Sequence, residues 1–140
     1  MRIDEKLETI VSKIEGLSFE YNDFARFNER TTLIKMPVCF VEIPLSGLFR
    51  TKHGIYRDKV IVTVSFLSLA ELDFEGKKNE IVVEQMKMFA KQFINQLNKS
   101  NLFKPLPDNV PYYIYYNKLN DNLTGVSLNL ELEDLKGVCL

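Results

Sequence analysis

The chain has 140 residues, of which 46% are hydrophobic and 26% are charged, and its 18 Lys and Arg residues nearly balance 19 Asp and Glu residues. These values are typical of one soluble globular domain, residues 1–140, which is long enough to bury a core without metal or disulfide staples. A net charge of −1 argues against a protein whose main task is to neutralise a phosphate backbone, and leaves only a local basic patch for that role. No run of 18 apolar residues occurs, so no membrane contact is expected.

The chain begins with two segments of different character. The first predicts an amphipathic helix that ends at Gly16, because its apolar residues follow helical spacing with charged residues between them: Ile3, Leu7, Ile10, Val11 and Ile14. The second, Leu17–Phe27, places aromatic residues among polar ones, which favours a short strand or an irregular aromatic segment.

Two strands follow. Leu33–Phe49 has an extended pattern, and Pro37 and Pro44 predict a bulge or an edge position in it, because proline cannot donate to a ladder. Arg57–Leu69 is the strongest predicted strand, since β-branched residues dominate it. Its alternate residues divide between a core face, with Val60, Val62, Val64 and Phe66, and a half-polar face, with Ile61, Thr63, Ser65 and Leu67. A half-polar face of this kind is normally covered by a helix or by another subunit.

A long helix is predicted over Asn79–Asn98, after a polar connection at Leu69–Lys78. Asn79 is its expected N-cap, and its apolar stripe consists of Val82, Met86, Phe89, Ala90, Phe93, Ile94 and Leu97. Three prolines in Asn101–Pro111 predict an irregular segment.

The chain closes with a predicted hairpin. A tyrosine-rich strand spans Tyr112–Leu119, and Asn120–Asn122 marks a turn. The last strand, within Gly125–Leu135, alternates apolar and polar residues without a miss from Val126 to Glu133.

Together these elements predict an α+β fold. We expect a mainly antiparallel sheet of four to five strands with two helices packed on one face, in the order α-β-β-α-β-β. A domain of this length has a diameter near ~37 Å, whereas a strand as long as Arg57–Leu69 spans roughly 43 Å. The hairpin tip around Arg50–Tyr56 should therefore stand clear of the domain and need a partner.

The hairpin is locally basic. Residues 50–59 contain four cationic residues and one acid, which gives this stretch a formal charge of +3. They are Arg50, Lys52, Arg57 and Lys59, with Asp58 as the acid. Two interpretations stay open: a solvated tip that prevents unwanted strand pairing, or a contact with an acidic surface or a nucleic acid.

The C-terminal segment is acidic. Glu131 and Glu133 share one face of the last predicted strand, and a solvated face is preferred over acid–base or cation chemistry because no ligand-like spacing accompanies them. A further hypothesis is that this acidic edge meets the basic hairpin of the next subunit in a head-to-tail ring.

The tyrosine-rich segment also has two interpretations. Tyr113 and Tyr115, within Tyr112–Tyr116, resemble a stacking platform for single-stranded nucleic acid, but Lys118 is the one nearby cation of that strand. Packing partly on the core and partly at an interface is preferred. The alternative function is thus a nucleic-acid-binding or protein-binding module that uses the basic hairpin and this strand.

Little in the sequence supports catalysis. Cys39 and Cys139 have no metal or redox spacing and are expected to be inert thiols, with a disulfide as the main alternative. His53 lies among cations in a loop and is expected to be solvated. No phosphate-binding glycine loop or serine elbow occurs, so we expect no enzyme activity, no cofactor and no metal site.

The order of elements resembles the tail-terminator and tail-completion proteins of tailed bacteriophages. The resemblance is carried by the N-terminal helix, the strand pair Leu33–Phe49 and Arg57–Leu69, the helix Asn79–Asn98 and the closing hairpin. It covers nearly the whole chain through its architecture and rests on no catalytic motif.

The resemblance implies a structural role in the virion, after assembly in the bacterial host cytoplasm. Such proteins form homo-oligomeric rings, with a hexamer favoured, that cap the tail tube and join it to the head connector. Tail-tube and head-connector proteins would then be the partners, with room for a passing contact with genomic DNA. By this analogy the hairpin Arg50–Lys59 and the face of Glu131 and Glu133 would be contact surfaces.

Overall fold

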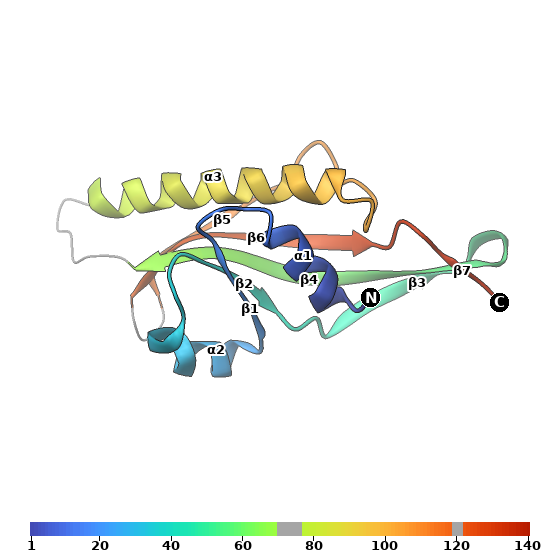
Figure 1. The fold of residues 1–140 in the computed structure, drawn as a ribbon, viewed down its shortest axis with the longest axis horizontal. Coiled ribbons are helices and arrows are strands. Elements are labelled where there is room, and N and C mark those ends of the chain that lie inside the picture. The colour runs from blue at the N-terminus through green and yellow to red at the C-terminus, as the bar shows by residue number, and fades with distance from the viewer. Residues whose placement is uncertain (70–76, 119–121) are drawn as a thin grey trace.

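The computed structural model describes residues 1–69, 77–118 and 122–140 (Figure 1). Over these residues the fold is α+β with a mixed, mostly antiparallel seven-stranded sheet, which confirms the predicted class. The helices are α1 (Ile3–Val11), α2 (Phe24–Arg30) and α3 (Lys77–Lys99), and the strands are β1 (Ser18–Asn22), β2 (Val38–Glu42), β3 (Ser46–Arg50), β4 (Ile55–Leu69), β5 (Tyr113–Lys118), β6 (Leu123–Glu133) and β7 (Val138–Cys139). Most of the predicted Leu69–Lys78 connection and Asn120–Asn122 turn, and Leu119, lie outside the described residues.

The sheet is organised around β4. The strand order is β1-β2-β4-β6-β5, and β3 and β7 pair with the beginning of β4. All eleven residues of β6 pair with β4, from Lys59 opposite Glu133 to Leu69 opposite Leu123. This long register confirms the two predicted alternating strands.

Helices α1 and α3 cover one face of the sheet, as predicted for two helices (Figure 1). Val62, Val64 and Phe66 of β4 are buried there, and the Phe66 ring meets Phe93 of α3 edge to face at 5.5 Å. Burial of each such side chain stabilises the fold by roughly 1.5–3 kcal/mol.

Two details of α3 differ from the prediction. The helix begins at Lys77, so the side chain of Asn79 is buried within its first turn and is not the N-cap. Val83 is buried whereas Val82 packs at the margin of the core, so the buried face of α3 differs slightly from the predicted stripe.

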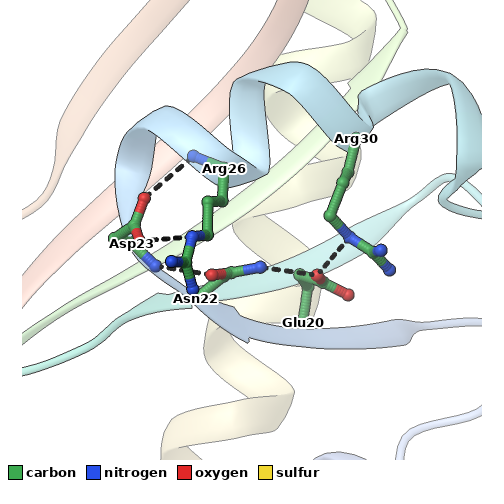
Figure 2. Close-up of polar contacts among 5 residues, drawn as sticks. All are labelled: Glu20, Asn22, Asp23, Arg26 and Arg30. Atoms are coloured by element: carbon green, nitrogen blue, oxygen red, sulfur yellow. Dashed lines mark hydrogen bonds and ion pairs between the residues drawn. The ribbon is translucent and has the colours of Figure 1, made fainter.

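The segment Leu17–Phe27 is both strand and helix. After β1, the side chain of Asp23 caps α2 by accepting a hydrogen bond from the Arg26 backbone N–H at 2.8 Å. Arg30 returns from the last turn of α2 to donate from Nε to Glu20 Oε1 of β1 at 3.2 Å, which ties the helix to the strand (Figure 2). The predicted order α-β-β-α-β-β therefore lacked the helix α2 and the strands β1 and β7, and it took β2 and β3 as one strand, so the sheet has seven strands where four to five were expected.

Helix α2 lies on the face opposite α1 and α3 (Figure 1). Its Phe27 stacks on Phe40 of β2 with ring centroids 3.8 Å apart, within a second small core. Because α2 forms the crossover from β1 to β2, these strands pair in parallel, whereas consecutive strands were expected to be antiparallel.

The rest of this second face is half polar, as predicted. Ser65 and Ser127 share a hydrogen bond of 2.9 Å, and Thr63 donates to Asn129 Oδ1 at 3.0 Å. Ile61 follows them toward the hairpin and is exposed. Helix α2 thus covers only one end of a face that the sequence predicts to be covered.

The expected interruption between Leu33 and Phe49 is confirmed. A 3-10 turn at Thr31–Leu33 and the Met36–Pro37 bond, which is cis, precede β2, and Pro44 lies between β2 and β3. Both strands pair with the same edge of β4, so the proline sits where a ladder bond is not required.

Gly125 allows β6 to approach β4 closely. A Cβ atom there would overlap the carbonyl oxygen of Phe66 and lie 2.9 Å from its carbonyl carbon. We expect Gly125→Ala to lower the free energy of unfolding by about 3 kcal/mol, because backbone atoms cannot yield as a flexible side chain can.

Urea denaturation measures this loss. Gly16→Ala is the control, since a Cβ at Gly16 meets open space and only its positive φ of 80° is unfavourable, at about 1–2 kcal/mol. A Gly125→Ala loss no larger than that of the control would contradict the close approach.

Candidate functional site

The hairpin formed by β3, a 3-10 turn at Lys52–Gly54 and the first half of β4 extends past the end of α3 (Figure 1). Every residue of β3 is exposed. His53 and Gly54 adopt positive φ values of 58° and 73° in the turn, and β7 pairs with Ile55 and Tyr56 below it. Strand pairing therefore supports the tip, with little help from the core.

Apolar side chains are exposed along this hairpin. The exposed fraction is 96% at Leu45 and 77% at Phe49, and Leu48 and Ile61 are about half exposed. The hairpin apolar residues are therefore Leu45, Leu48, Phe49 and Ile61. A group of large apolar residues on a projecting element is typical of a protein-contact surface.

Four of the predicted site residues come together where the end of β6 meets the hairpin. Glu133, whose side chain is only 8% exposed, forms ion pairs with Arg50 Nε and Lys104 Nζ. Lys59 Nζ lies 3.0 Å from Glu131 Oε2. The acidic pair and two of the hairpin cations thus compensate each other within one chain, and contact of these residues with a second subunit stays a prediction.

Lys104 is the member of this cluster that the sequence does not indicate. It belongs to the proline-rich segment after α3, which has no periodicity from which a neighbour can be inferred. Its backbone N–H donates to the Glu133 carbonyl oxygen at 2.9 Å, which aligns the segment with the end of β6. Only the folded chain brings its ammonium to the carboxylate.

The ion pairs lower the pKa of Glu133 below the usual range of a glutamate. The hydrogen bond from Lys104 is the largest cause, and the charges of Lys104, Arg50 and Lys59 act in the same direction, while burial opposes them. The carboxylate is therefore held in its charged form.

The tyrosine strand forms a separate group. Tyr113 pairs with Ser127 and Tyr115 with Gly125, so Tyr113 lies six β6 residues, about 20 Å, from the register position of Glu133. Tyr113 is exposed, and Tyr115 packs partly against the second core. Lys87 of α3 places its ammonium 4.9 Å from the centre of the Tyr112 ring, a cation that the sequence pattern does not reveal.

Lys52 and Arg57 lie near the hairpin turn, and neither forms an ion pair in the described part of the chain. Lys52 is exposed, whereas Arg57 is partly buried. These two cations remain uncompensated beside the Glu133 cluster.

The cysteines are both free. Cys39 is buried in the main core, where burial raises the pKa of its thiol far above the ordinary value, and Cys139 is exposed. His53 is exposed at the turn. Among residues 1–69, 77–118 and 122–140, no group of three or more His, Cys, Asp or Glu side chains is arranged to hold a metal ion.

No protein-family model and no curated protein matches this chain. Of the helices within the described ranges, none combines the length and the hydropathy required to cross a membrane.

The depressed pKa of Glu133 predicts a pH-dependent contribution to stability. Its stabilisation is fully present above the ordinary glutamate pKa of 4.5 and is lost as the pH falls through the lower pKa of the folded state. We expect Glu133→Gln to lower the free energy of unfolding by about 1–2 kcal/mol at pH 7, and the difference from wild type to shrink below pH 4.5.

Denaturation curves at pH 7 and at acidic pH measure this difference. Glu131→Gln is the matched control, because the Glu131 side chain is 62% exposed and its pair with Lys59 is worth less than about 1 kcal/mol. Equal effects of the two substitutions, or a Glu133→Gln effect independent of pH, would count against the buried cluster.

Proposed function

We propose that this chain is a structural virion-assembly protein of a tailed phage or prophage, a ring-forming tail-terminator or tail-completion protein at the head–tail junction. The observation that carries the proposal is the projecting β3–β4 hairpin with its exposed apolar residues Leu45, Leu48, Phe49 and Ile61. The architectural resemblance to the phage proteins supplies the biological setting.

The hairpin favours contact with other copies of the chain. Leu48 and Ile61 lie on one face of the hairpin and Phe49 on the other, since alternate residues of a strand point to opposite faces. A surface on a projecting element is suited to a head-to-tail contact with a different surface of the next copy, and such contacts close into rings when the rotation allows.

The remainder of the proposal follows from the resemblance. A hexameric ring is favoured, its partners are tail-tube and head-connector proteins, and its place is the virion after assembly in the host cytoplasm. In this role the protein acts by shape and contact and has no catalytic activity.

Light scattering after size-exclusion chromatography, at several protein concentrations, tests the ring. We expect a multiple of the 16.3 kDa chain that dissociates on dilution, and we expect Phe49→Ser to raise the dissociation constant at least tenfold, because it removes the most exposed aromatic side chain of the hairpin.

Met88→Ser serves as the control, since Met88 is an exposed apolar residue of α3 that lies away from the hairpin. Its oligomeric state should match wild type. A strict monomer that also fails to bind purified tail tubes would rule the proposal out. An equal rise of the dissociation constant in both variants would show that the hairpin is not the contact surface.

A second candidate is a nucleic-acid-binding module. It is favoured by the exposed Tyr112 and Tyr113 and by the ammonium of Lys87 over the Tyr112 ring, where Lys87 also pairs with Glu84 at 3.1 Å. We expect its affinity for a single-stranded oligonucleotide to fall steeply with salt, and Tyr113→Ala to weaken binding by roughly 1–3 kcal/mol. Absence of binding at low salt, measured by fluorescence anisotropy, would eliminate this candidate.

A further inference from the structure

Beside the hairpin turn lies an open hollow of about 500 Å³, lined by Arg50, Thr51, Lys52, Arg57 and Lys104. These residues come from β3, the turn, β4 and the segment after α3, so four parts of the chain converge there. All the charged residues that line it are cationic. A phosphate group is much smaller than this hollow, so its size does not exclude it.

Two of these cations oppose each other directly. Arg50 of β3 and Arg57 of β4 are register partners, so their side chains leave the same face of the hairpin next to one another. Like charges in this position destabilise a pair of strands. An anion between them would convert the repulsion into attraction.

The protein supplies little negative charge to the hollow. Glu133 pairs through one carboxylate oxygen with Arg50 and through the other with Lys104. Four cations against this carboxylate leave a formal excess of 4 − 1 = +3. Lys59 does not change the balance, because it pairs with Glu131.

Arg57 adds an observation of a different kind. Its Nε atom is buried and has no hydrogen-bond partner within the described residues. An unpaired buried N–H group is unfavourable, so an acceptor that reached it would stabilise the fold. The hollow therefore combines an excess of positive charge with an Arg57 N–H group that has no acceptor among the described residues.

We propose that this hollow is a binding site for an oxyanion of the phosphate class, held by Arg50, Lys52, Arg57 and Lys104. A tetrahedral phosphate presents acceptor oxygens in several directions, which suits cations that converge from four segments. A carboxylate ligand would supply only one negative charge, whereas the hollow has a formal excess of +3. A phosphate-class anion carries more negative charge and fits this excess better. The site goes beyond the proposed structural function and does not depend on ring formation.

Isothermal titration of the full chain with inorganic pyrophosphate, at low ionic strength, tests the site. We expect saturable binding with one equivalent per chain. Arg57→Gln and Lys52→Gln should each weaken it at least fivefold. Lys52 is exposed, so its substitution leaves the packing intact should Arg57→Gln impair folding.

Lys91→Gln is the matched control, because it removes the same charge from an exposed position in the middle of α3. Its affinity for pyrophosphate should equal that of wild type. Absence of saturable binding, or an equal loss in Lys91→Gln and Lys52→Gln, would overturn the proposal, since the effect would then be one of net charge alone.

A competition arm identifies the source of the phosphate. If a single-stranded oligonucleotide displaces pyrophosphate, and the salt slope of its binding falls by about one in Lys52→Gln, the site holds nucleic-acid phosphates. If the oligonucleotide does not compete while pyrophosphate binds, the ligand is a small phosphate compound. Either result supports the site.

Discussion

The pairing of β4 with β6 is the interaction on which the rest of the structure depends. All eleven residues of β6 take part, and the same register that buries Val64 beside Leu128 on one face sets Lys59 beside Glu133 on the other. A slip by one residue would exchange the two faces. The core and the charged cluster are therefore fixed by a single ladder, and the missing Cβ of Gly125 makes room for its close approach to Phe66.

The fifteen residues of β4 span ~50 Å, which is more than the core accommodates. Its second half is held between β2 and β6 under α3, while its first half has β3 on one side and β7 beyond β6 on the other. This first half gains backbone hydrogen bonds but little apolar burial. The hairpin is thus stabilised by strand pairing that continues from the part of β4 in the core. Its exposed apolar side chains remain available for other contacts.

The sequence predicts the parts of this structure that depend on local periodicity. The alternation in β4 and β6 is such a case, because period two is visible over many residues. Helix α2 was missed because its seven residues complete about two turns, too few to display an apolar stripe, and its cap depends on the single side chain of Asp23. The parallel pairing of β1 with β2 follows from that helix and could not be predicted without it.

The candidate site shows the same limit. The period-two pattern places Glu131 and Glu133 on one face, but it does not show that their surroundings differ. Glu133 is paired with Lys104 of the proline-rich segment, whereas Glu131 is paired only with Lys59 among the described residues. The hairpin cations were predicted as one group, whereas the fold divides them into Arg50 and Lys59, which have carboxylate partners, and Lys52 and Arg57, which have none in the described ranges. Tertiary contacts thus determine which of these cations have a carboxylate partner.

The two proposals share the hairpin: Leu48 lies on the same face as Arg50, whereas Phe49 lies on the opposite face. Phe49 and Arg50 are neighbours in β3, so their side chains leave on different sides of the hairpin. A subunit contact through Phe49 therefore leaves the oxyanion hollow beside Arg50 and Arg57 accessible, unless the next copy wraps around the tip. Because exposed apolar area and uncompensated positive charge are both unfavourable in an isolated chain, their presence together on a segment outside the core favours two binding partners, with Phe49 on the face that the hollow does not use.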